Sequence, residues 1–207
     1  MSTFELKHPG LNLGDTDPQA HAAAEELVFG FWVFLMSDLI LFALLFATYA
    51  TMTHATAGGP GGRTLFELKS AALETGVLLA SSFTFGMASL AMKYVEQRRV
   101  LIFWLSVTLL LGACFLGLEI HDFLTMFAKG GAPTRSGFLS AFFILVPTHG
   151  LHVLAGSIWM IVMIVQIMVF GIDQGVKIRI LRLGLFWHFL DIIWIGIFSV
   201  VYLRGLA

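Results

Sequence analysis

Five long apolar runs constrain this chain more than any other feature of its sequence. They cover roughly residues 27–50, 71–92, 100–120, 138–170 and 183–203. Each run reaches or exceeds the ~20 residues that an α-helix needs to cross the hydrocarbon core of a bilayer. A helix also satisfies its own backbone hydrogen bonds, which is required inside lipid. The pattern predicts an all-α fold, a polytopic membrane helical bundle with about five transmembrane helices.

The composition agrees with this class and excludes others. Only 12% of the residues are charged and 58% are hydrophobic, whereas soluble domains carry about 25% charged residues. A net charge of -1 provides no basic field for nucleic acid. The single cysteine excludes a disulfide framework within the chain and a multi-cysteine metal site. No nucleotide loop, nucleophile elbow or paired-carboxylate hydrolase motif occurs, so we expect no catalytic centre in this chain.

The segments between the runs are predicted to be loops and a tail. Residues 1–26 are polar and are predicted to form a soluble N-terminal tail, followed by a transmembrane domain over residues 27–207. Glycine and proline predict loops at 51–69 and 123–137, and charge predicts short loops at 93–99 and 173–182. Pro147 removes a backbone donor within the fourth run, which predicts a kink there.

Basic residues in these loops predict the orientation. The loops at 93–99 and 173–182, on the side of the N-terminal tail, hold three basic residues each, and the opposite loops hold two each. The positive-inside rule then places the N-terminus in the cytoplasm and the C-terminus outside.

Asp38, Glu74 and Glu119 are carboxylates that fall within the first three apolar runs. Asp38 lies near the middle of the first run, where an unpartnered carboxylate costs at least a few kcal/mol. Two interpretations stay open: a proton or lipid-cleft site, or a structural carboxyl bonded to Ser37 or a neighbouring helix. Glu74 and Glu119 lie closer to the run ends, and we expect them to reach the interface.

Two pairs of polar residues, each containing histidine, suggest contacts between the last two runs. His149 and His152 stand three residues apart, as do His188 and Asp191, and this spacing puts side chains on one face of a helix. These groups could bind a metal or ligate a haem. They could also hydrogen-bond across packed helices, which is common for polar side chains in membranes. We favour the structural interpretation.

Several motifs, each on its own run, match a known family. The chain resembles subunit III of the haem-copper respiratory oxidases over roughly residues 25–204. The matching motifs are FLMSD at 34–38, LLASS at 78–82, FLGLE at 115–119, HGLHV at 149–153, and WHFLD at 187–191 followed by Trp194.

Further details resemble the quinol-oxidising, bo-type branch of this family. The cytochrome c oxidase form has seven spans and carries Ser-Glu where this chain has Ser37-Asp38. The loop at 56–60 and the segment at 136–143 also look like the bo-type subunit. Pro147 departs from the family pattern, in which a small residue is expected.

The resemblance implies an accessory role in a bacterial inner-membrane complex. The complex would oxidise ubiquinol, reduce dioxygen to water and pump protons. Subunit III would carry no redox cofactor, since the haems and copper belong to subunit I. Its expected partners are subunit I as the main contact, subunits II and IV, and membrane phospholipid held in a cleft. The resemblance places Asp38 in that cleft and makes a set of buried polar residues structural: His149, His152, His188, Asp191 and Glu119.

Two rival functions remain open at this stage. One is a small haem-binding membrane anchor that uses His149 or His152 together with His188. The other is a proton-coupled transporter centred on Asp38, against which the lack of inverted-repeat symmetry argues.

Overall fold

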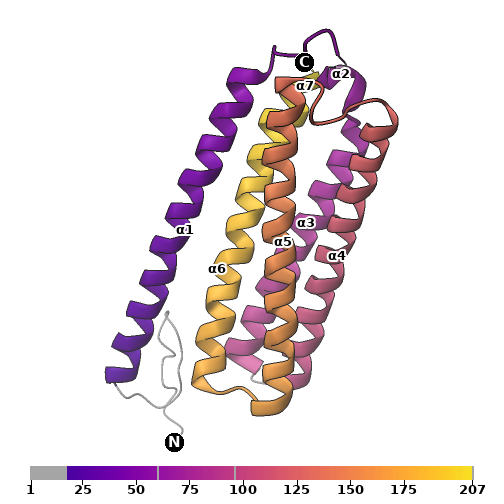
Figure 1. Cartoon of the computed structure of the whole chain (residues 1–207). Helices are drawn as coiled ribbons and strands as arrows, with labels where there is room; N and C mark the ends of the chain where they lie inside the picture. The colour runs from indigo at the N-terminus through magenta and orange to yellow at the C-terminus, as the bar shows by residue number, and fades with distance from the viewer. Residues whose placement is uncertain (1–17, 60, 96, 207) are drawn as a thin grey trace, which may run out of the picture.

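The chain folds as a bundle of long helices (Figure 1). A computed structural model describes residues 18–59, 61–95 and 97–206, and no strand occurs among them. The elements are α1 Pro18–Met52, α2 Gly62–Leu65, α3 Leu68–Leu90, η1 Ala91–Val95, α4 Arg98–Ala128, α5 Gly137–Phe170, α6 Gln174–Ile197, η2 Phe198–Leu203 and α7 Arg204–Leu206. The short elements η1 and η2 are π-helical continuations of α3 and α6.

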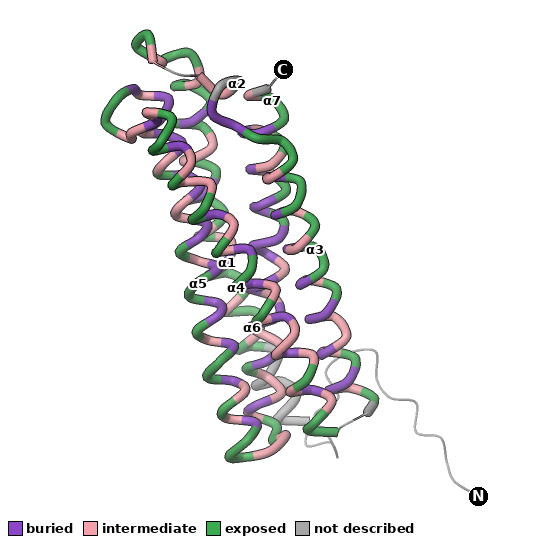
Figure 2. The backbone as a smooth tube through the Cα atoms, turned by 90° about the vertical axis from the view of Figure 1, so that its right-hand side faces the viewer, coloured by how far each residue is buried: buried purple, intermediate pink, exposed green. Residues whose placement is uncertain are grey.

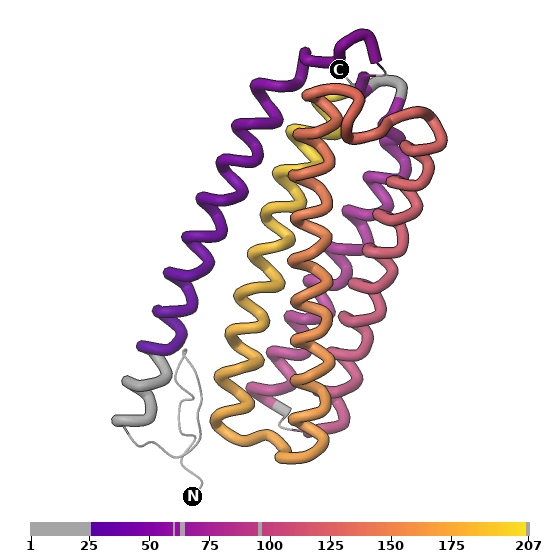
Figure 3. Tube along the Cα trace, viewed as in Figure 1, coloured from indigo at the N-terminus to yellow at the C-terminus, as the bar shows by residue number. Residues whose placement is uncertain are grey.

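Five of these helices are long and apolar enough to cross a membrane, which confirms the predicted all-α class and number of spans. The candidate spans are Glu26–Met52, Leu68–Tyr94, Arg98–Ala128, Gly137–Phe170 and Gln174–Leu203. They alternate in direction along the bundle (Figure 3). Helix α1 begins at Pro18, within the range expected to form the tail, and the rest of that expectation, residues 1–17, lies outside the described residues.

The loop predicted at 173–182 is wrong, because α6 already begins at Gln174. The Asp173 side chain caps the helix by accepting a hydrogen bond from the Gln174 backbone N–H at 2.6 Å. Buried Val176, Ile180 and Leu183 then hold this first part of α6 against the bundle. Charged residues that suggested a loop therefore lie on a helix that extends beyond the apolar run.

The loop predicted at 123–137 is shorter in the structure and covers residues 129–136. Helix α4 continues to Ala128 and ends where Gly130 adopts a positive φ of 80°. Helix α5 begins at Gly137, after the Ser136 side chain has accepted a hydrogen bond from the Leu139 N–H at 3.2 Å. It runs as one continuous helix through Pro147, although this residue supplies no backbone donor (Figure 1).

The helices differ in how much of each is enclosed. In the most apolar stretch of the span that contains α6, 56% of the residues are buried. In the corresponding stretch of α1 only 11% are buried. Helix α6 packs on α3, α5 and α1, whereas α1 packs mainly on α5 and α6 and lies at the edge of the bundle (Figure 1). Figure 2 shows the buried and exposed residues along each helix. Many of the polar contacts described below involve residues of α5 or α6.

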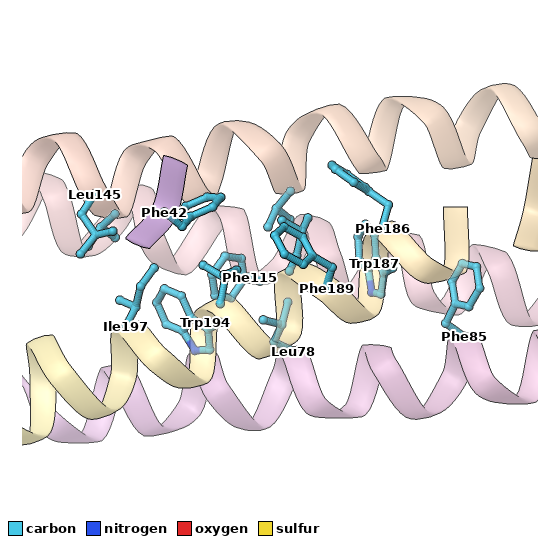
Figure 4. Close-up of a cluster of buried hydrophobic side chains, with 14 of the residues drawn as sticks. Phe42, Leu78, Phe85, Phe115, Leu145, Phe186, Trp187, Phe189, Trp194 and Ile197 are labelled. Carbon is cyan, nitrogen blue, oxygen red and sulfur yellow. The ribbon is translucent and has the colours of Figure 1, made fainter. Parts of the chain in front are cut away.

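Two tryptophans of α6 form the centre of the core (Figure 4). The indole of Trp187 donates to Ser81 Oγ at 3.1 Å, and that of Trp194 donates to Thr75 Oγ1 at 3.0 Å, so both bind α3. Trp187 fits because α4 carries glycine at 112, where a Cβ would lie 2.8 Å from the ring. These contacts fix the rotation of α6 and thereby determine which neighbour each of its polar residues meets.

Candidate functional site

Polar side chains occur in pairs near the middle of the candidate spans. Asp38 lies at the middle of the α1 span, His152 at the middle of the α5 span, and His188 at the middle of the span formed by α6 and η2. The middle of a span corresponds to the centre of a bilayer, where polar groups need partners.

Asp38 and His152 join α1 to α5. Their Oδ2 and Nε2 atoms lie 3.6 Å apart, and both side chains are largely buried. The other ring nitrogen, Nδ1, lies 2.7 Å from the Thr148 carbonyl oxygen. Because a carbonyl can only accept, Nδ1 carries a hydrogen and Nε2 faces the carboxyl.

This contact fits the structural interpretation of Asp38, in which the carboxyl meets a neighbouring helix. The Ser37 hydroxyl donates instead to the Phe34 carbonyl at 2.6 Å. The rings of Phe42 and Phe186 lie beside His152, with centroids 5.2 and 6.4 Å from the imidazole. The pair is therefore surrounded by aromatic side chains.

His188 and Asp191 form a second pair, with both residues on α6. His188 also contacts Ser82 and thereby joins α6 to α3. Nδ1 of His188 lies 2.9 Å from Ser82 Oγ and 3.4 Å from Asp191 Oδ2. Asp191 is buried, but the His188 side chain remains 45% exposed. The prediction that His188 is buried is wrong, and its place on α6 turns the ring toward Ser82 of α3.

His149 is fully buried and makes the contact between α5 and α6. Its Nε2 lies 3.2 Å from the Leu190 carbonyl, so this nitrogen donates. The ring packs against Trp194 and Phe115, with centroid distances of 5.2 and 5.7 Å. Its expected partner on α6 is thus found, but it is a backbone carbonyl rather than a side chain.

Two glutamates expected at the interface are inside the bundle. Glu74 is fully buried and Glu119 is 3% exposed. Glu119 lies over Gly150 of α5, where an added Cβ would collide with both carboxylate oxygens. Asp122 lies close enough to Glu74 for their charges to interact, and its Oδ1 accepts a hydrogen bond from Ser70 at 2.7 Å. The distance of Glu74 and Glu119 from the run ends did not reveal that they are buried, because the helices extend beyond the runs.

The arrangement does not favour a haem or metal site. Among the described residues, no three His, Cys, Asp or Glu side chains converge on a position that could hold a metal ion. His149 is directed at Leu190, His152 at Asp38, and His188 at Ser82. The three imidazoles therefore belong to different helix contacts.

Sequence reasoning did not identify two of these partners. Ser82 is part of the LLASS motif at 78–82, and the motif did not indicate its hydrogen bond to His188. Gly150 was part of a motif but had no assigned role. A hydroxyl near the middle of a span was a usable signal for Ser82, whereas nothing in the sequence indicated that Gly150 faces Glu119.

Comparison with known proteins gives a consistent result over nearly the whole chain. Residues 15–206 match the family described as cytochrome c oxidase subunit III. The chain is 50% identical to cytochrome bo(3) ubiquinol oxidase subunit 3 of Pseudomonas aeruginosa, with 99% of both chains covered. It is 52% identical to the Pseudomonas putida protein of the same name, with 89% of each chain covered, and 42% identical to quinol oxidase subunit 3 of Bacillus subtilis, with 87% of this chain and 88% of that protein covered.

Proposed function

This chain belongs to the cytochrome c oxidase subunit III family, and we propose that it is the third subunit of a bacterial ubiquinol oxidase. The observation that carries the proposal is the 50% identity to a subunit 3 of this kind over 99% of both chains. In the complex, ubiquinol is oxidised, dioxygen is reduced to water and protons are pumped. The chain itself acts as an accessory subunit without a redox centre.

The proposed role is to support assembly and stability with its partners. Subunit I, which would hold the haems and copper, is the main contact, and subunits II and IV complete the complex. The polar contacts of this chain fit such a role, because His149, His152 and His188 each bind a neighbouring helix rather than converging on one centre. Interhelical hydrogen bonds of this type stabilise bundles in lipid.

We also propose that phospholipid covers α1. Many of its large apolar side chains are exposed, including Phe29 at 69%, Ile40 at 64% and Leu44 at 65%. In a bilayer, acyl chains cover such surfaces. The Asp38–His152 pair lies on the inner side of this helix, so it links α1 to the bundle beside the lipid. From the basic residues in the loops, we also propose that the N-terminus is cytoplasmic and the C-terminus periplasmic.

A redox difference spectrum tests the proposed function. The chain is tagged, extracted in mild detergent, and measured before and after its co-purifying proteins are stripped. We expect haem absorbance in the first sample and none in the second. Haem that stays with the stripped chain would instead support the histidine anchor, and haem in neither sample, with the complex shown to be intact, would contradict the oxidase assignment.

A further inference from the structure

One side of α6 is open to the surroundings of the bundle. Five residues at steps of three and four along α6 and η2 define a surface that we call the α6 face: Leu185, His188, Ile192, Ile195 and Ser199. Ile192 is 67% exposed and Ile195 is 46% exposed. The face is apolar apart from Ser199 near its end and the half-exposed imidazole of His188 at its middle. A polar ring among exposed apolar side chains is unusual for a surface that only meets acyl chains.

The depth of His188 limits what can bind it. His188 and its partner Ser82 both lie at the middle of their candidate spans. The hydrocarbon core is about 30 Å thick, so lipid headgroups lie roughly 15 Å away. Nδ1 is occupied by Ser82 and Asp191, whereas no described residue binds Nε2. A hydrogen-bonding group from another molecule must therefore come to mid-membrane depth to satisfy this nitrogen.

We propose that the α6 face docks a transmembrane helix of another oxidase subunit, whose hydroxyl or carboxamide side chain hydrogen-bonds to Nε2 of His188. This inference rests on the proposed function, because it needs a complex with other membrane-spanning subunits. A hydroxyl or carboxamide fits both tautomers of the ring. If Nδ1 donates to Asp191, Nε2 accepts, and if Nδ1 accepts from Ser82, Nε2 donates.

The α3 side of this face has room for a helix. Ser82 and Gly86 stand four residues apart on α3, and a Cβ added at Gly86 would meet nothing within 4 Å. Small residues at this spacing allow two helices to approach closely in a membrane. The polar contact at His188 and the small residues beside it therefore favour a helix over a quinone or an acyl chain as the occupant.

Two tryptophan substitutions at matched positions test the docking in the intact complex. Ile192 on α6 and Leu110 on α4 are 67% and 69% exposed, and both lie near the middle of their spans. We expect Ile192→Trp to lower the recovery of this chain with the haem-containing subunits about threefold or more, the scale of one interhelical hydrogen bond. Leu110→Trp should leave recovery unchanged. Equal effects of the two substitutions, or a larger effect of Leu110→Trp, would overturn the proposal.

A cross-link identifies the occupant of the face. Ile195→Cys is made in a Cys114→Ser background, since the chain has no other cysteine, and a short photo-reactive group is attached within the complex. A cross-link to a transmembrane peptide of another subunit supports the proposal, and cross-links only to quinone or lipid overturn it. The wild-type complex separates the two hypotheses: absence of haem there contradicts the proposed function, whereas haem with no effect of Ile192→Trp contradicts this inference alone.

Discussion

Two histidine–carboxylate pairs lie at the same depth of the bundle but differ in how they are completed. The Asp38–His152 pair uses both ring nitrogens within the chain, one on Asp38 and one on the Thr148 carbonyl. The His188–Asp191 pair uses only Nδ1, and the His188 side chain is 45% exposed, against 21% for His152. Both pairs thus combine a histidine with an aspartate near the middle of the spans. They differ at Nε2 of the histidine, which faces Asp38 in the internal pair and has no partner among the described residues in the open pair.

The largest effect is expected at Gly150, the residue after His149, where α5 packs against the buried side chain of Glu119. Gly150→Ala places a methyl group against both Glu119 oxygens, and we expect a loss of about 1–3 kcal/mol in unfolding free energy, the usual range for overpacking. Unfolding in detergent measures it. Gly117→Ala is the control, since a Cβ there meets nothing, and Glu119→Ala in the same chain should restore part of the loss. Equal stability of the Gly150 and Gly117 variants would refute the enclosed arrangement.

Breaking the internal pair should destabilise the isolated chain. Asp38→Leu leaves Nε2 of His152 without its partner, which we expect to cost about 1–3 kcal/mol, the penalty for an unsatisfied buried polar group. The double variant with His152→Leu should regain much of this, because removing both partners leaves nothing unsatisfied. A double-mutant cycle on unfolding free energies measures the coupling, and additive losses would show that the two groups do not interact.

The open pair should respond differently to the matching change. His188→Leu removes a half-exposed ring, so we expect the isolated chain to lose less stability than with Asp38→Leu, about 0.6 kcal/mol for one interhelical hydrogen bond. The intact complex should lose melting temperature and subunit recovery. Co-purification and thermal melts of both samples decide the point. An unchanged complex with a destabilised isolated chain would make His188 an internal residue like His152.

The internal pair is not expected to act in turnover. Asp38→Asn preserves the shape of the side chain and keeps a polar group beside His152, so the initial rate of quinol oxidation should stay near that of the unaltered complex. Stopped-flow or oxygen-electrode rates measure it. A fall beyond about tenfold, equivalent to roughly 1.4 kcal/mol in the barrier, would instead assign Asp38 to proton delivery.

The smallest effect is expected where an ion pair lies in water. Glu67 and Lys129 are 2.7 Å apart outside the spans, and the hydrogen bond from Lys129, with its charge, lowers the pKa of Glu67. The pair therefore stabilises the fold above the ordinary carboxyl pKa of about 4.3 and loses this contribution as the pH falls through the lowered value. Stability measured against pH, with Glu67→Gln as the reference, should show only a slight extra loss in acid for the unaltered chain, and salt should reduce it.

The sequence by itself determined the class of this protein and the number of its spans. Runs of about 20 apolar residues leave only a helical solution in lipid, so this prediction did not depend on contacts. The run boundaries were less informative, because helices α4 and α6 continue through charged segments beyond the apolar runs. Motif order also indicated the family, which the match over residues 15–206 establishes.

Only the tertiary structure decided which polar group meets which. The three-residue spacing of His149 and His152 put them on one side of a helix, yet one contacts α6 and the other contacts α1. Trp187 and Trp194 fix the rotation of α6 against α3, and this rotation directs His188 away from α5. Partner choice depends on the rotation and packing of whole helices, and spacing within one helix carries no information about either.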